Sequence, residues 1–136
     1  MRFSPGEMKM EKILFVAVGG AVGSSLRYLL AGWGQRLIAS PFPLGTMLVN
    51  ILGCLAIGFL ATALSGPLLV REHWRIAILV GVLGGFTTFS SFCWETVSLG
   101  GDGQFALAGL NVLAQNALGL TAAWVGARLA QAIFGL

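Results

Sequence analysis

Charged side chains are scarce in this sequence. Asp, Glu, Lys and Arg make up 10% of its 136 residues, whereas hydrophobic residues make up 57% and the mean hydropathy is +0.88. A typical soluble domain carries roughly 25% charged residues. A small chain leaves much of its surface exposed when it folds, so one core cannot hide this much apolar area. The composition therefore argues against a water-soluble globule and predicts that apolar surface faces lipid.

The sequence also lacks the side-chain sets of an enzyme, a metalloprotein or a nucleic-acid-binding protein. Its two cysteines, Cys54 and Cys93, lie in apolar runs, and its one histidine, His73, lies in a charged segment, so no metal-ligand spacing occurs. No nucleophile, base and orienting group stand together. The eight Lys and Arg residues are scattered at the ends of apolar runs. Because they form no basic patch for phosphates, we expect no nucleic-acid partner.

Four long apolar runs are present, each near the ~20 residues that a helix needs to cross a bilayer. We expect membrane-spanning helices over residues 13–34, 44–64, 76–97 and 105–134, with the first run retained as a span. Glycines four residues apart, Gly19 with Gly23 and Gly81 with Gly85, are typical of helices that pack closely in lipid. The predicted fold class is an all-α, multi-pass membrane protein with a single four-helix domain over residues 1–136.

The middle of the third run is unusual for a membrane helix. Residues 84–92 read GGFTTFSSF, so two glycines precede four hydroxyl residues at membrane depth. Glycine costs about 1 kcal/mol relative to alanine inside a helix, and hydroxyl side chains compete for backbone hydrogen bonds. Broken helices occur in membranes where the freed backbone faces protein, water or an ion. The segment indicates either such a break, which would mark a site, or an unbroken helix whose Ser and Thr bond to the preceding turn.

Polar side chains recur on one face of the second and fourth runs. Thr46 and Asn50 are four residues apart, and so are Asn111 and Gln115. Because an amide in hydrocarbon needs partners, these residues act either as glue between helices or as donors along a path. Together with the hydroxyl residues of the third run, these residues make three polar faces without a buried acid. Such faces favour an anion path over a cation or proton path.

The phenylalanines of the third run and Arg27 of the first run each admit two interpretations. Phe86, Phe89 and Phe92 recur every three residues, which fits ordinary packing or a path lined by the positive edges of aromatic rings. Arg27, near the end of the first run, either reaches the interface or concentrates anions at a pore mouth. Glu95, just after the charge-free stretch of the third run, is expected to extend to the interface.

The sequence resembles the CrcB or Fluc family of bacterial fluoride channels over essentially the whole chain. The first run matches at Gly19, Gly20, Ala21, Val22, Gly23, Ser25, Leu26, Arg27 and Tyr28, and the second at Pro43, Leu44, Gly45, Thr46, Val49, Asn50 and Gly53. The most specific match covers residues 81–92, with Glu95 close behind.

The resemblance implies an antiparallel, dual-topology homodimer of four-helix subunits, with the third helix broken near its middle. It implies two fluoride pores and a structural Na⁺ at the dimer interface, bound by backbone carbonyls of Gly84 and Thr87. Phe89 and Phe92 would be the pore-lining aromatic pair, and Asn50 the pore amide. The residues expected along the fluoride path are Thr46, Asn50, Thr88, Phe89, Ser91, Phe92, Asn111 and Gln115, with Arg27 in the vestibule.

The implied function is passive, fluoride-selective export from the cytoplasm through the bacterial plasma (inner) membrane, which gives fluoride resistance and involves no enzymatic step. The fourth run departs from the family pattern of tyrosine and serines, since Asn111, Gln115 and Gly119 take those places. Two other classes remain open. A non-transporting packing subunit would explain the glycines, and a small multidrug or cation antiporter would normally need a carboxylate in the membrane, which residues 13–26 lack.

The basic residues are unevenly distributed between the two predicted sides of the membrane. One side would carry Arg2, Lys9, Lys12, Arg71, Arg75 and Arg128, and the other Arg27 and Arg36. This bias favours a single orientation, whereas an antiparallel homodimer needs both. A start at Met10 would remove two of the six basic residues. The sequence therefore leaves open whether the partner is a second copy or a paralogue.

Overall fold

The computed structural model describes residues 10–37, 40–66, 68 and 70–135, and the regular structure in these ranges is helical. Its elements are α1 (Met10–Arg36), α2 (Leu44–Ala63), α3 (Glu72–Ile76), the π-helix η1 (Ala77–Val82), α4 (Leu83–Phe86), α5 (Phe89–Gly101) and α6 (Phe105–Phe134). The segments from α3 to α5 follow one another in one rod, Glu72–Gly101, which we call the third span.

The described residues contain four helices that are long and apolar enough to cross a membrane, which confirms the predicted all-α class. Relative to the expected ranges, α1 and the third span extend further at both ends, α2 ends at Ala63, and α6 covers the range expected. Arg2 and Lys9, and with them the choice between Met1 and Met10 as the start, lie outside the described residues.

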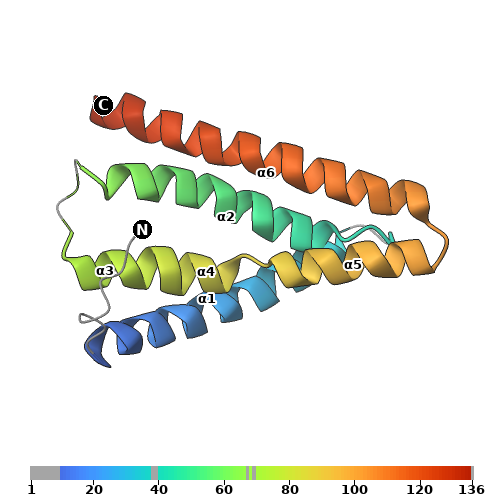
Figure 1. The fold of residues 1–136 in the computed structure, drawn as a ribbon, viewed down its shortest axis with the longest axis horizontal. Helices are drawn as coiled ribbons and strands as arrows, with labels where there is room; N and C mark the ends of the chain where they lie inside the picture. Colours follow the sequence, from blue (N-terminus) through green and yellow to red (C-terminus); the bar gives the residue numbers. More distant parts are fainter. Residues whose placement is uncertain (1–9, 38–39, 67, 69, 136) are drawn as a thin grey trace.

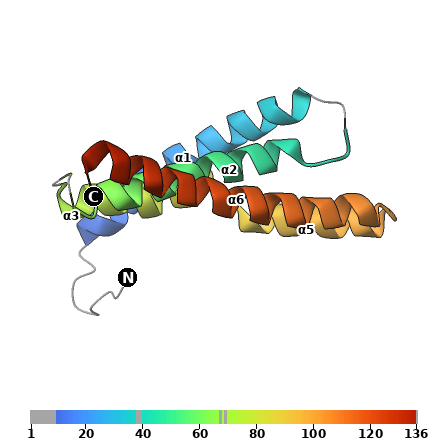
Figure 2. The same ribbon diagram turned by 90° about the horizontal axis from the view of Figure 1, so that it is seen from above.

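The four helices lie side by side as a flattened bundle (Figure 1). Helix α6 packs along α2, and α1 packs against η1 and α4. The view from above shows α1 beside α2 and α5 beside α6 at the same end of the molecule (Figure 2). The start of α1, the connection from α2 to α3 and the end of α6 lie together at the opposite end. There the Nζ of Lys12 lies 2.9 Å from Oε1 of Glu72.

Glycine lets these helices approach backbone to backbone. A Cβ added to Gly23 would overlap the carbonyl oxygen of Val82, and one added to Gly85 would lie 2.7 Å from the carbonyl oxygen of Gly20. The predicted close packing of the spaced glycines is therefore confirmed where α1 crosses the third span. Gly126 on α6 similarly faces the backbone of Leu55 on α2, where an added Cβ would overlap the carbonyl oxygen.

The third span departs twice from α-helical geometry. The first departure is η1, where the turn widens to a π-helix over six residues. The second lies between α4 and α5, where Thr87 (φ −81°, ψ 161°) and Thr88 (φ −150°, ψ 115°) are extended. The two parts nevertheless remain joined, with a bend of only 15°. The third span is thus one rod with a two-residue step in its backbone.

Candidate functional site

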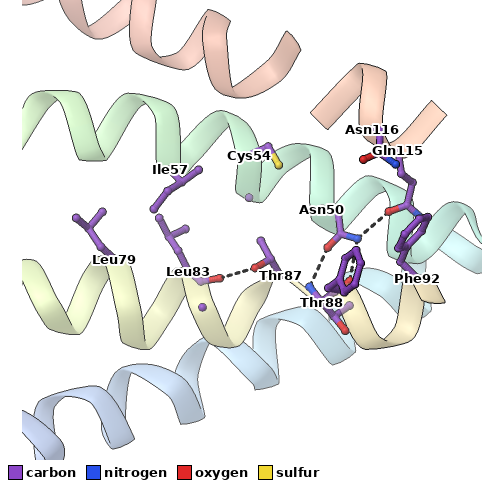
Figure 3. A pocket seen from close by; sticks show the side chains of 13 residues that line it. Asn50, Cys54, Ile57, Leu79, Leu83, Thr87, Thr88, Phe92, Gln115 and Asn116 are labelled. Atoms are coloured by element: carbon purple, nitrogen blue, oxygen red, sulfur yellow. Dashed lines mark hydrogen bonds between the residues drawn. The ribbon is translucent and has the colours of Figure 1, made fainter. Parts of the chain in front are cut away.

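A cavity of about 350 Å³ lies beside the two-residue step, between α2, the third span and α6 (Figure 3). Its lining residues are Asn50, Gly53, Cys54, Ile57, Leu79, Leu83, Gly84, Thr87, Thr88, Phe89, Phe92, Gln115 and Asn116. None of these described residues is charged. The cavity thus combines an apolar wall with amide, hydroxyl and aromatic groups at membrane depth.

Thr88 begins α5 and caps it with its own side chain. Its Oγ1 accepts a hydrogen bond from the backbone N–H of Ser91 at 3.1 Å and donates one to Oγ of Ser91 at 2.9 Å. A hydroxyl in this position satisfies an N–H group that the first helical turn leaves without a partner. The same residue is 7% exposed, so the step in the backbone is buried on this side.

Asn50 on α2 holds both backbone groups of Thr88. The N–H of Thr88 donates to Oδ1 of Asn50 at 2.8 Å, and Nδ2 of Asn50 donates to the carbonyl of Thr88 at 3.0 Å. In a continuous helix that N–H would bond to the carbonyl of Gly84, four residues earlier. The asparagine side chain therefore replaces a helical hydrogen bond and stabilises the extended step.

A chain of side-chain hydrogen bonds continues from Asn50 into α6 and back to α5. Asn50 Nδ2 donates to Oε1 of Gln115 at 2.7 Å, and Gln115 Nε2 donates to Oδ1 of Asn111 at 2.9 Å. Asn111 Nδ2 donates to Oγ1 of Thr96 at 2.8 Å, and Thr96 donates to the carbonyl of Phe92 at 2.7 Å. Asn111 is fully buried. The polar faces of α2 and α6 thus meet as one network.

Phe89 and Phe92 lie next to each other, with ring centroids 5.5 Å apart and planes inclined by 47°. Their surroundings differ, because Phe92 is 8% exposed and Phe89 is 76% exposed. Phe86 lies in α4, on the other side of the extended step. The predicted stripe of three phenylalanines is therefore not on one continuous helix, and two of the three line the cavity.

Glu95 lies inside α5 and turns its carboxyl group into the protein. Oγ1 of Thr46 donates to Oε1 of Glu95 at 2.5 Å, and Oε2 is buried without a partner among the described residues. The prediction that Glu95 reaches the interface is wrong, because α5 continues to Gly101 and places this residue away from the helix end. Thr46 is committed to this carboxyl group and does not line the cavity.

Arg27 lies beside the step, since its Nη1 is 3.5 Å from the carbonyl oxygen of Thr87. The carbonyl of Gly84 has lost the amide of Thr88 as its helical partner, and Gly84 itself is exposed. Two carbonyls near the step are therefore oriented outside regular helical bonding. Hard cations take oxygen ligands of this kind, so Gly84 and Thr87 fit the donor set expected for Na⁺, with Arg27 as a competing cation at Thr87.

The structure brings most of the predicted site residues to one place. Asn50, Gly84, Thr87, Thr88, Phe89, Phe92 and Gln115 line the cavity, whereas Thr46, Ser91, Asn111 and Arg27 do not. Ser91 and Asn111 contact the lining residues through hydrogen bonds. Cys54 and the aliphatic lining residues Ile57, Leu79 and Leu83 could not be predicted from the sequence. An apolar residue in an apolar run looks the same in sequence whether it faces a cavity or lipid.

The comparisons with known proteins agree with one another. The model of the family described as CrcB-like protein, Camphor Resistance (CrcB), matches residues 14–127. A fluoride-specific ion channel FluC of Solibacter usitatus is 47% identical over 120 residues, which cover 88% of this chain and 98% of the relative. FluC of Geobacter sulfurreducens is 47% identical over 86% of this chain and 94% of the relative. FluC of a Roseiflexus species is 40% identical over 89% and 98%.

Proposed function

Because this chain belongs to the CrcB-like family, we propose that it is a membrane channel that carries fluoride out of the bacterial cytoplasm. The relatives named fluoride-specific ion channels match it over nearly their whole length, at 40–47% identity. Four membrane-length helices support a multi-pass protein of the inner membrane. A channel carries out no chemical conversion, so this function is not enzymatic.

The observation that carries the proposal is the uncharged, donor-lined cavity at the step in the third span. Fluoride must exchange its water for hydrogen-bond donors to cross hydrocarbon. Amide N–H groups and aromatic ring edges supply positive partial charge without a fixed cation that would trap the ion. We place the fluoride path along Asn50, Thr88, Phe89, Phe92 and Gln115.

The other expected site residues support this path at a distance from the cavity. Asn111 bonds to Gln115, Ser91 bonds to Thr88, and Thr46 binds the inward carboxyl of Glu95. Arg27 supplies positive charge beside the step and would raise the local fluoride concentration in a vestibule. Fluoride enters cells as hydrogen fluoride and ionises in the neutral cytoplasm, so a passive path lets the accumulated anion leave.

We propose that two copies assemble antiparallel, each providing part of a pore. Phe89 supports this arrangement, because it lines the cavity yet leaves 76% of its surface exposed, as expected if a partner helix covers it. Antiparallel assembly requires both orientations in one membrane, against the charge bias of the sequence. Accessibility of a cysteine placed at each terminus should show both orientations for a homodimer. A single orientation would point to a paralogue as the partner.

We also propose that carbonyl groups of Gly84 and Thr87 hold a structural Na⁺ at the interface of the two copies. When bound, Na⁺ would supply a positive charge shared by carbonyl dipoles of both copies. A ligand that binds the folded, assembled protein but not the unfolded chain stabilises the assembly by mass action. The thermal midpoint of the purified dimer should therefore be higher in sodium than in choline, and equal midpoints would count against the site.

The function is tested with the purified protein in liposomes. Fluoride-loaded vesicles should empty when the protein is present, while chloride-loaded vesicles should retain their anion. Equal leakage of both anions would contradict selectivity, and no flux without another protein would support the packing subunit.

Glu95 favours one alternative, a proton-coupled exchanger, because it places a carboxyl group inside the third span. An imposed pH gradient, with equal fluoride and zero membrane potential across the vesicle membrane, separates the two. A proton-coupled exchanger should then drive net fluoride movement beyond that of protein-free vesicles. A passive channel should not, because neither the fluoride gradient nor the membrane potential drives the anion.

A further inference from the structure

The hydrogen bonds around the step form a closed circuit with a single direction. Running from donor to acceptor, the members are the Thr88 N–H, Asn50, Gln115, Asn111, Thr96 and the Phe92 carbonyl. We call this set the amide circuit. Each of its five bonds measures between 2.7 and 2.9 Å. Because Thr88 and Phe92 belong to the same short stretch of the third span, the circuit closes through the backbone.

The two ends of the amide circuit decide how every side-chain amide is oriented. An isolated Asn or Gln can exchange its oxygen and nitrogen by a flip of the amide group. The backbone N–H of Thr88 can only donate, and the backbone carbonyl of Phe92 can only accept. Each group between them must then accept on one side and donate on the other. If Gln115 alone flipped, its side-chain nitrogen would face the side-chain nitrogen of Asn50, and its oxygen would face the side-chain oxygen of Asn111. Neither hydrogen bond could then form.

Within the amide circuit, this orientation determines which proton is left for an anion; Asn116, which also lines the cavity, lies outside the circuit and is not oriented by it. Both N–H groups of Asn50 are used, one by Gln115 and one by the Thr88 carbonyl. Gln115 uses one N–H for Asn111, its other N–H has no partner in the part of the chain that the structure describes, and Gln115 lines the cavity. Asn111 has a second N–H too, but it is fully buried and outside the cavity.

We propose that the amide circuit is a positioning device, in which Gln115 presents its remaining N–H to fluoride and Asn50, Asn111 and Thr96 hold it in that orientation. The inference rests on the proposed fluoride path and assigns the direct contact and the supporting roles within it. If the orientation is lost, the cavity receives the carbonyl oxygen of Gln115 in place of its N–H. An oxygen lone pair repels an anion, so flux falls although the cavity keeps its shape.

Thr96 offers the sharpest test, because it belongs to the amide circuit but does not line the cavity. Thr96→Val keeps the side-chain shape and removes the acceptor of Asn111. Loss of a neutral hydrogen bond of about 1 kcal/mol predicts a roughly fivefold slower fluoride efflux. Thr96→Ser restores the hydroxyl and should restore the rate. Thr62→Val is the matched control, because Thr62 makes the same bond to the carbonyl four residues earlier, on α2, and should conduct like the wild type.

The outcomes separate this inference from the proposed function. Wild-type protein that carries no fluoride refutes the channel itself. If the wild type conducts fluoride and Thr96→Val conducts at the same rate, the positioning role is refuted. It is also refuted if Thr96→Val is slow and Thr96→Ser is equally slow. A slower rate restored by serine supports it, as does complete loss of flux in folded Gln115→Met.

A second measurement holds even where Thr96→Val fails to fold. In the wild type, both side-chain amide protons of Asn50 are bonded, whereas Asn116 makes one bond, to Val112, and is exposed. Hydrogen exchange of the Asn50 side-chain amide, followed by NMR, should be at least about tenfold slower than that of Asn116, which corresponds to about 1.4 kcal/mol. Equal exchange rates would overturn the amide circuit.

Discussion

Replacing Asn50 by leucine should reveal how much the step in the third span depends on one side chain. The change removes three hydrogen bonds at once, two to the backbone of Thr88 and one to Gln115. Hydrogen bonds between membrane helices contribute about 0.6 kcal/mol on average and up to about 1.7 kcal/mol. Three of them give a loss of roughly 2–5 kcal/mol in the free energy of unfolding. Leucine keeps the branched shape of asparagine and the same number of side-chain heavy atoms, so the main loss is one of polar partners.

The N–H of Thr88 decides what happens to the backbone in Asn50→Leu. Without the Asn50 oxygen, this buried N–H either stays unpaired or returns to the Gly84 carbonyl and converts the step into helix. The second result changes the position of Phe89 relative to the cavity, and both results remove the donor that Asn50 presents to Gln115. We therefore expect fluoride efflux from liposomes to fall by about tenfold or more, the factor that corresponds to 1.4 kcal/mol.

The assay combines reversible unfolding in detergent with fluoride efflux from vesicles. Asn116→Leu is the stability control, because Asn116 is exposed and, among the described residues, its side chain bonds within α6, to Val112. Its unfolding free energy should stay within about 0.5 kcal/mol of the wild type. Wild-type stability together with wild-type efflux in Asn50→Leu would refute the reasoning, since three bonds of the lengths observed would then contribute nothing.

Three further predictions concern the aromatic pair, the helix crossing and the inward carboxyl. Phe89→Ile or Phe92→Ile should slow fluoride flux while the proteins elute like the wild type in size-exclusion chromatography, and unchanged flux in both would remove the pair from the proposed path. Gly23→Val should lower the unfolding free energy by ~1–3 kcal/mol or prevent folding, because a Cβ there overlaps the third span, whereas Gly32→Ala meets no atom within 4 Å and should fold normally. Thr46→Val leaves the neighbouring carboxyl without its donor and should cost about 1–3 kcal/mol in denaturant titration, with Thr46→Ser restoring stability.

The number, type and approximate bounds of the helices follow from the sequence because lipid imposes a simple rule of length and polarity. Glycine spacing likewise predicts the crossing of α1 and the third span, since the contact depends on small side chains at helical period. The unusual composition of residues 84–92 marks the stretch that contains the two-residue step, although the two parts of the third span remain joined with a bend of 15°.

Side-chain partners could not be predicted in the same way. Asn50 and Gln115 are 65 residues apart, and nothing in either run indicates that one amide accepts from the other. The position of Glu95 could not be predicted because it depends on where α5 ends and on a hydrogen bond from Thr46, 49 residues away. A polar residue in a membrane helix predicts that a hydrogen-bond partner is needed. Which residue supplies that partner depends on how the helices pack together.

The wide turn η1 sets the rotational phase of everything that follows it. A π-helical turn closes with i→i+5 hydrogen bonds and so holds one residue more than an α-helical turn. Deleting one residue from 77–82 would let this turn tighten to an ordinary α-helical one, and Thr88 would still face α2. An added residue would find the turn already widened, and because each residue of an α-helix advances the chain by about 100°, it would rotate Thr88 by roughly that angle away from Asn50. We therefore expect these six residues to tolerate the loss of one residue better than the gain of one.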